Sequence, residues 1–376
     1  MMEKDKIILV CLVSEQTIPN VQFIKWYFSQ NQNKIDILFI STEEMEKKGK
    51  TKHIENTLVS FRNSFEAAVI TTDENDMDKV LESLRCYFLE KQFENIIVNI
   101  TGGTKLMSLA AYQFFIQLEN SKIFYQPIGK PLQQLYPETK KYDMFEILSL
   151  EEFLSAHGIR FSFNNECVKD WDFNKTVFDL IIKDNHQMIK KMVVLQNNSW
   201  FKNIWKRKDS LNFEEIPEEK FSNIEGISVS KNEMCELLSL FGFNLQDVRL
   251  AHIRYITGGW FEEYVYQKIC NEEDNVEEKN VALNVNISKG NDKNELDIIY
   301  LDRDNKLHII ECKSFVDGRE GGKVLNDALY KLQAIIKSKF GLFVKQHLYT
   351  KSIIEKETPL TRAREFGIDI KDRSEI

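Results

Sequence analysis

The stretch 307-LHIIECKS-314 is an apolar run that predicts a β-strand, yet it carries an acid and a base near its end. Side chains alternate between the two faces of a strand, so Glu311 and Lys313 point to the same face. A salt bridge at a strand end would account for one acid with one base. The sequence just upstream contains a second acid, which favours a different interpretation.

The segment 294-NELDIIYLDRDNKLHIIECKS-314 reads as two strands joined by a turn. Residues 302–305, Asp-Arg-Asp-Asn, are typical turn residues. Because the open ends of an antiparallel pair are neighbours, we expect Asp297, Glu311 and Lys313 to converge although 14 residues separate the two acids.

Two carboxylates and a lysine in one place suit phosphodiester cleavage. Carboxylate oxygens are the ligands that Mg²⁺ or Mn²⁺ requires. The cation activates a water, and a lysine offsets the charge that develops on the phosphate. The pattern therefore predicts a metal-dependent nuclease with Asp297 and Glu311 as metal ligands and Lys313 as a catalytic residue that orients the water or offsets the developing charge.

A third acid is available on the predicted helix that contains 258-GGWFEEYVY-266. Glu262 shares the apolar stripe of this helix, so we expect it to face the core and to complete the metal and catalytic set. Glu263 is expected in solvent. An acid near a helix N-terminus is also favoured by the helix dipole alone. Lys331 and Gln333, on a later predicted helix, are weaker candidates, and surface positions are the favoured interpretation for both.

Composition sets broad limits on the protein. A chain of 376 residues with 43% hydrophobic and 29% charged residues predicts two globular domains and a smaller third element. A net charge of −8 argues against an extensively basic surface. The six scattered cysteines form no close pairs, so neither a zinc site nor a disulfide framework is expected. With no signal peptide and no membrane segment recognised, we expect a cytoplasmic protein without a membrane partner.

The N-terminal part alternates predicted strands and helices, which favours a doubly wound parallel sheet. The strands are expected at 7–13, 35–40, 67–71 and 95–100, with edge strands at 121–125 and 145–148, and helices at 21–28, 51–61, 77–88 and 106–117. In the middle part, helices are expected at 177–192 and 233–240. The stretch 200-WFKNIWKRK-208 suits either a nucleic-acid contact or, as the favoured interpretation, a solvated connector face.

The turn 101-TGGTK-105 lies between a buried strand and a helix, where backbone N–H groups and the helix end favour an anion. It matches neither the P-loop nor GxGxxG. A second polar segment, 14-SEQTIPN-20, and the pair Ser41-Thr42 follow other strands of the same sheet. These strand ends predict one crevice for a nucleotide with several phosphates, although a tight turn without a ligand remains the alternative.

Together these motifs resemble a known family. Residues 1–157 resemble a CARF domain, the Rossmann-like sensor of type III CRISPR systems, through "LVSEQTIPN" and "NITGGTK". Residues 251–376 resemble the PD-(D/E)xK restriction-endonuclease-like α/β domain fused to such sensors, through "GGWFEEYVY", "ELDII" and "IIECKS". The usual proline before the first acid is replaced by Leu296. Residues 158–250 resemble no named family and are expected to be a partly helical connector.

The resemblance implies an allosterically activated effector with a cyclic oligoadenylate, most simply cyclic tetra-adenylate, bound across the two-fold axis of a homodimer. By position, the base and ribose side of the crevice would be Ser14, Gln16, Thr17 and Asn20. The phosphate side would be Thr101, Gly102, Gly103, Thr104 and Lys105. The resemblance further implies metal-dependent cleavage of RNA and DNA, with single strands as the expected substrate.

Two other functions compete with this one. A CARF-like regulator would read DNA through residues 160–250 and would carry an inert C-terminal domain. A restriction or repair nuclease would bind an ordinary nucleotide at its N-terminal domain. The sequence does not separate RNA from DNA as the substrate, nor does it decide whether the sensor degrades its activator.

Overall fold

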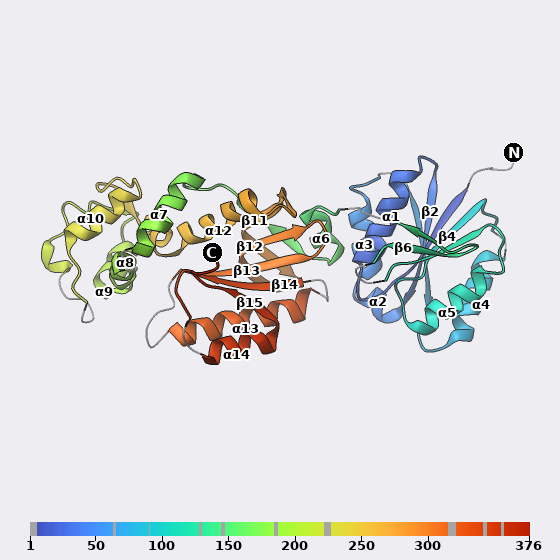
Figure 1. Cartoon of the computed structure of the whole chain (residues 1–376). Helices are drawn as coiled ribbons and strands as arrows, with labels where there is room; N and C mark the ends of the chain where they lie inside the picture. The colour runs from blue at the N-terminus through green and yellow to red at the C-terminus, as the bar shows by residue number, and fades with distance from the viewer. Residues whose placement is uncertain are drawn as a thin grey trace.

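The computed structural model describes residues 6–62, 65–89, 91–127, 130–143, 147–183, 187–221, 227–314, 321–340, 344–354 and 357–376. Figure 1 shows an elongated chain in which the C-terminal α/β domain lies between the N-terminal α/β domain and a helical middle segment. Within the described ranges, no helix has both the length and the apolar character needed to cross a membrane.

The N-terminal domain contains the predicted parallel sheet. Its strand order is β3-β2-β1-β4-β5-β6-β7, and the first five strands are parallel. These strands are β1 (Ile7–Leu12), β2 (Ile35–Thr42), β3 (Glu66–Thr72), β4 (Asn95–Asn99) and β5 (Ser121–Tyr125). Every residue of β1 and β2 is buried, which explains the unbroken apolar sequence of β1 and the mostly apolar sequence of β2.

Helices cover both faces of this sheet (Figure 1). Two main helices lie on each face: α1 (Ile18–Gln30) and α3 (Lys50–Leu58) on one, α4 (Met77–Phe88) and α5 (Lys105–Phe115) on the other. The short α2 (Glu43–Lys47) begins at Thr42, whose hydroxyl accepts from the Met45 amide and so caps the helix rather than opening into a crevice.

The edge of the sheet differs from the sequence-based expectation. It is completed by the antiparallel pair β6 (Leu132–Tyr136) and β7 (Lys140–Tyr142), which the polar sequence of both strands concealed. Of the strand expected at 145–148, residues 145 and 146 lie outside the described residues, and residues 147 and 148 form no strand.

The C-terminal domain is a mixed six-stranded sheet of order β15-β14-β13-β12-β11-β8. Its long strands are β11 (Val276–Lys289), β12 (Asp292–Asp302) and β13 (Leu307–Lys313), followed by β14 (Val344–Thr350) and β15 (Ile368–Lys371). Helix α12 (Trp260–Glu272) lies on one face, and α13 (Gly321–Lys339) and α14 (Glu357–Phe366) cover the other (Figure 1). The first strand of the sheet in sequence, β8 (Arg160–Ser162), precedes the whole middle segment and pairs with β11.

The middle segment is helical, with α7 (Trp171–Lys183), α8 (Gln187–Asn197), α9 (Ser199–Trp205), α10 (Lys231–Leu240) and α11 (Leu250–Arg254). It also contains the short 3₁₀ helix Glu218–Lys220 and the antiparallel pair β9 (Ser210–Leu211) and β10 (Val248–Arg249). The single helix expected at 177–192 is therefore wrong, because two helices, α7 and α8, occupy that stretch. The connector-face interpretation of 200–208 is also wrong for its aromatic residues, since Phe201 is fully buried and Trp200 and Trp205 pack on the same core.

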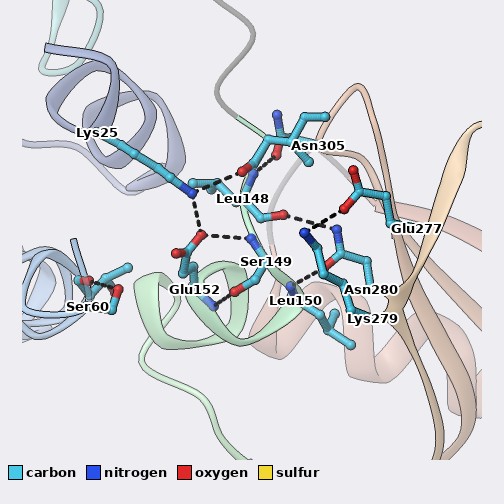
Figure 2. A network of polar contacts seen from close by, with 12 residues as sticks. Lys25, Ser60, Leu148, Ser149, Leu150, Glu152, Glu277, Lys279, Asn280 and Asn305 are labelled. Carbon is cyan, nitrogen blue, oxygen red and sulfur yellow. Dashed lines mark hydrogen bonds and ion pairs between the residues drawn. The ribbon is translucent and has the colours of Figure 1, made fainter. Parts of the chain in front are cut away.

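The two α/β domains meet at helix α6 (Leu150–Ala156), as Figure 2 shows. Asn305, in the turn between β12 and β13, accepts from the Leu148 amide at 2.7 Å. Asn280 of β11 accepts from the Leu150 amide at 3.1 Å and donates to the Leu148 carbonyl at 3.4 Å. Both asparagines are buried. The C-terminal domain therefore holds the chain that enters α6 through hydrogen bonds to buried backbone groups.

The N-terminal domain holds the same helix from the other side. Lys25 of α1 donates to the Ile147 carbonyl at 3.0 Å and forms an ion pair with Glu152 of α6 at 2.9 Å (Figure 2). Glu152 and Ser149 also form a reciprocal cap at the start of α6. Helix α6 is thus fixed to both domains, and one continuous hydrophobic cluster runs from β1 through α6 to the C-terminal sheet.

Replacing Asn280 should weaken this junction. Asn280→Ala leaves the buried Leu150 amide and Leu148 carbonyl without their side-chain partner, which should cost about 1–3 kcal/mol of unfolding free energy. Chemical denaturation measures this loss. Asn286→Ala, at an exposed position on the same strand, is the matched control and should stay within about 0.5 kcal/mol of the parent. Equal stability of the two variants would contradict the role of Asn280 in the junction.

Candidate active site and ligand crevice

The predicted hairpin brings the two acids together. Strands β12 and β13 are antiparallel, with Ile298 opposite Ile310 and Leu301 opposite Leu307. One step beyond that ladder, a carboxylate oxygen of Asp297 accepts from the Cys312 amide at 2.7 Å. The Lys313 ammonium lies 2.6 Å from Glu311 Oε1 and 3.9 Å from Asp297 Oδ2. Asp297, Glu311 and Lys313 therefore form one cluster, as the sequence predicted.

Glu311 has a second lysine partner. The ammonium of Lys331, on α13, lies 2.7 Å from Oε2 and 3.0 Å from Oε1 of Glu311. The buried Glu311 carboxylate is thus bound by lysines from two different elements. The surface interpretation of Lys331 is wrong in this respect: its side chain is partly exposed but reaches the carboxylate. A lysine spaced along an amphipathic helix gives no sequence signal for this contact.

Glu262 lies close enough to the cluster to interact with it electrostatically. Burial, followed by repulsion from Asp297, raises the pKa of Glu262 to about 8. Burial and the neighbouring Glu311 raise the pKa of Asp297 to about 6. Burial disfavours the charged form of Lys313, but Glu311 and Asp297 outweigh it and raise the pKa of that ammonium. The helix that carries Glu262 starts after a π-helical turn, Tyr255–Gly259, and such turns are frequent at functional sites.

The expectation that Glu263 points into solvent is wrong. Glu263 is buried and accepts from the Tyr255 hydroxyl at 2.7 Å and from the Val168 amide at 2.7 Å. It also accepts from the Lys169 amide at 3.3 Å. The carboxylate therefore ties α12 to the start of the middle segment and is turned away from the acid cluster.

The donor set fits a hard divalent cation. Asp297, Glu311 and Glu262 offer carboxylate oxygens, and their mutual repulsion in a buried place is what a cation relieves. Among the described residues, no three acidic, histidine or cysteine side chains are already gathered into a metal-binding arrangement. Lysine ammonium groups occupy both oxygens of Glu311 instead.

At the N-terminal domain, a network of asparagines joins the ends of β1 and β4. Asn20 donates to the Leu12 carbonyl at 2.8 Å and accepts from Asn99 at 3.0 Å. The side-chain oxygen of Asn99 accepts from the Thr101 amide at 3.1 Å and from the Thr101 hydroxyl at 2.5 Å. The two predicted polar segments are therefore joined side by side. Asn99 was missed from the sequence because it lies within the buried strand expected at 95–100.

The glycine pair lets the two segments approach closely. A Cβ on Gly102 would lie 2.0 Å from the Leu12 carbonyl oxygen, so no other residue fits there. Gly103 has a φ of +72°, in the left-handed region that glycine adopts without strain. The Ser14 hydroxyl lies 3.5 Å from the Cβ position of Gly102. This close approach places the start of helix α5 directly beside the loop that follows β1.

The candidate ligand residues fall into two groups. The side chains of Lys105, Ser14 and Gln16 are exposed or half-buried. In contrast, Thr17 is fully buried and its hydroxyl donates to the carbonyl of Ala156 at 2.5 Å. The Thr104 hydroxyl caps α5 by accepting from the Met107 amide, and the Thr101 hydroxyl accepts from the Gln126 amide at 2.9 Å.

Glu15, which sequence reasoning passed over, joins the crevice loop to the domain junction. It pairs with Lys50 at 2.6 Å and with Lys48 at 2.8 Å. Burial alone would raise the pKa of Glu15. The hydrogen bonds and charges of Lys48 and Lys50 together have the larger effect and lower this pKa to about 2. The pKa of Lys289, in β11, is lowered by burial and then by Lys50. The charged groups behind the crevice loop therefore act across the junction on the C-terminal domain.

Three family models match the chain in succession. The model of the Card1 CARF domain matches residues 8–153, that of the Card1 hinge domain residues 164–252, and that of the Card1-like endonuclease domain residues 250–376. The three matches follow the three parts of the structure, and the hinge match covers the segment for which the sequence suggested no family. A search of curated proteins found no match.

Solved structures show the same fold over the whole chain. Protein VC1899 from Vibrio cholerae is 20% identical, with a TM-score of 0.72 over 98% of this chain and 94% of its own. Can2 from Sulfobacillus thermosulfidooxidans, in complex with cyclic tetra-adenylate, is 21% identical, with a TM-score of 0.64 over 98% of this chain and 96% of its own. A type III CRISPR defence DNA nuclease activated by cyclic oligoadenylate is 14% identical, with a TM-score of 0.55 over 93% of this chain and 46% of its own.

Proposed function

The chain belongs to the Card1 family of CARF-domain effector nucleases of type III CRISPR systems, and on that premise we propose that it is a metal-dependent nuclease activated by a cyclic oligoadenylate. It acts in the cytoplasm on single-stranded RNA or DNA. The observation that carries the nuclease proposal is the cluster of Asp297, Glu311 and Glu262 with two lysines at one end of a hairpin. A regulator with an inert C-terminal domain has no use for such a cluster.

In this proposal the three carboxylates hold Mn²⁺ or Mg²⁺. When bound, the cation supplies activation of water and neutralisation of charge at the phosphate. Lys313 lies within reach of both Glu311 and Asp297, so its ammonium is placed to offset the negative charge that develops on the phosphate. Asp297 is oriented by the Cys312 amide, which leaves its second oxygen for a ligand.

The activator proposed is cyclic tetra-adenylate, the ligand of the similar Can2 structure. Lys105, Ser14 and Gln16 meet it with their accessible side chains, and the amides of Gly102 and Gly103 face its phosphates. The second group of candidates, Thr17, Asn20, Thr101 and Thr104, shapes the crevice, because their side chains are bound to backbone or to Asn99.

A homodimer is proposed because a symmetric ring needs two copies of the crevice. Helix α5 starts at the crevice, and three exposed apolar side chains lie along it: Leu106 (40% exposed) and Leu109 (58%) within the helix and Ile116 (36%) at its C-cap. Their spacing of three and seven residues places them on one face of the helix. A second copy of this face would cover them and would bring the two crevices together.

Activation is proposed to pass through Thr17 and α6. The crevice loop touches the C-terminal end of α6 through the hydrogen bond from Thr17 to Ala156. Four residues later the chain enters β8, which pairs with β11 of the nuclease sheet. A change in the crevice loop therefore has a continuous covalent and hydrogen-bonded connection to the sheet that carries Asp297.

Cleavage assays with labelled single strands test the proposal as a whole. The full chain with Mn²⁺ should cut RNA, DNA or both far faster with cyclic tetra-adenylate than without it. Cleavage that is equally fast without the ring would support a restriction or repair nuclease. Binding of the ring without any cleavage, with both nucleic acids and both cations, would support the regulator.

Neutral substitutions at the acids should abolish cleavage. Glu311→Gln and Asp297→Asn keep the size of each side chain but remove the charge that holds the cation, so nearly all activity should be lost. Lys313→Ala should be severe as well while leaving Mn²⁺ binding largely intact. Thermal melting and binding of the activator serve as controls, and both should survive. Folded variants that cut at the parent rate would remove these residues from the site.

Two substitutions in the sensor domain should separate binding of the activator from the activation of cleavage that follows it. Lys105→Ala should weaken binding of cyclic tetra-adenylate by about 1–3 kcal/mol, the range for a lost hydrogen bond to a charged group. Thr17→Val keeps the shape of a buried side chain but removes the hydroxyl, so the ring should still bind while the activation factor of cleavage falls. Calorimetry and cleavage rates measure the two effects. Loss of binding in Thr17→Val with full activation at saturation would instead make Thr17 a ligand residue.

A charge on the exposed face of α5 should prevent dimer formation. Leu109→Glu places a carboxylate where a second copy of the same face would pack, so light scattering should report a monomer. Val59→Glu is the control, because Val59 is also exposed but follows α3, on the other face of the sheet. A parent protein that is monomeric with and without the ring at micromolar concentration would rule out the shared crevice.

A further inference from the structure

Lys331 is the second lysine, besides Lys313, that contacts the buried Glu311 carboxylate. It lies on α13 at the edge of the acid cluster, and its ammonium contacts both oxygens of Glu311. The Lys331 side chain is 37% exposed, whereas that of Glu311 is 3% exposed. The lysine therefore reaches from the surface down to a buried carboxylate.

The two lysines of the cluster do not have the same contacts. Lys313 binds Oε1 of Glu311, donates to the Cys312 carbonyl and lies near Asp297, so it bridges the two acids. Among the described residues, Lys331 contacts Glu311 and not Asp297, and its ammonium lies 2.7 Å from Oε2 of Glu311. A divalent cation on Glu311 needs the same oxygen lone pairs that these ammonium groups occupy.

From this geometry we propose that Lys331 is a second active-site lysine that competes with the divalent cation for Glu311 and, when released, binds a phosphate of the nucleic acid. The inference rests on the proposed nuclease function and adds a residue to it. In the absence of a cation, Lys331 keeps the buried Glu311 carboxylate compensated and in place.

Charge balance supports this role. The charges of Asp297 and Glu311 are balanced by the ammonium groups of Lys313 and Lys331. A divalent cation adds positive charge to this balance, which attracts a phosphodiester. Since the Lys331 side chain is more than a third exposed, its ion pair is screened by water and its exchange between partners costs little. The stem of the lysine extends from a helix that Leu329 and Leu332 bury against the sheet, so the ammonium stays near the cluster in either state.

The decisive experiment measures Mn²⁺ affinity and cleavage in the same variants. In Lys331→Met the competitor for Glu311 is gone, so Mn²⁺ should bind about two- to fivefold more tightly, the range for a partly exposed ion pair. Cleavage at saturating Mn²⁺ should nevertheless fall about tenfold or more, because a charged contact to the phosphate is lost. Lys331→Arg keeps the charge, so it should hold Mn²⁺ affinity near that of the parent and retain more activity than Lys331→Met.

Lys323→Met is the matched control, because Lys323 is exposed on the same helix. It should change neither quantity. Weaker Mn²⁺ binding in a folded Lys331→Met variant would show a structural role and would overturn the proposal, as would unchanged affinity with unchanged cleavage. The Mn²⁺ titration needs no activity, so a parent protein that cuts nothing would refute the proposed function while still testing whether Lys331 competes for Glu311.

Discussion

The buried hydrogen bonds around helix α6 are the constraint on which the arrangement of the two α/β domains depends. Asn280 and Asn305 satisfy the backbone at the start of the helix, and Thr17 satisfies a carbonyl at its end. Buried backbone groups without partners are costly, so these contacts are hard to exchange for others. Helix α6 therefore belongs equally to the domain that holds the ligand crevice and to the domain that holds the acids.

Because both domains share helix α6, a ligand bound in the crevice of the N-terminal domain can affect the packing of the C-terminal domain. The apolar side chains of α1, α3 and α6 lie in one hydrophobic cluster with those of β11, β12 and α13. A close-packed core responds to a shift by repacking rather than by gradual deformation. The polar contacts of Glu15 with Lys48 and Lys50 surround the same junction and add charges that a bound phosphate would repel or attract. The transmission proposed from the crevice to the acid cluster would thus have both an apolar and an electrostatic path.

Sequence patterns predicted most of the fold and much of the site, for reasons that particular residues make clear. The buried strands β1, β2 and β4, which are apolar at their centres, and the hairpin of Asp297 and Glu311 were predictable because local patterning determines them. The strands β6 and β7 were not, because their polar residues lie at a sheet edge. Contacts such as Glu311 with Lys331 and Thr17 with Ala156 join residues far apart in sequence, and no local pattern encodes them. The wrong placement of Glu263 has the same origin, since its partner Val168 is 95 residues away in the sequence.

One backbone feature connects the junction to the acid cluster. In β11, Leu283 packs in the core beside α12, whereas Val285 packs in the core shared with α6 and α13, so the strand changes faces between them. Asn284, at that point, has a φ of +53°, which is uncommon for a residue other than glycine.

Strand β12 changes faces at the same level. Leu296 packs in the core shared with α6, Ile298 packs in the core beside α12, and the residue between them is Asp297. Irregularities of this kind re-aim side chains next to active sites. Two residues farther along β11, the ladder to β8 begins, and β8 follows α6 in the chain. Through β8 and β11, α6 is therefore connected to the backbone that sets the direction of Asp297.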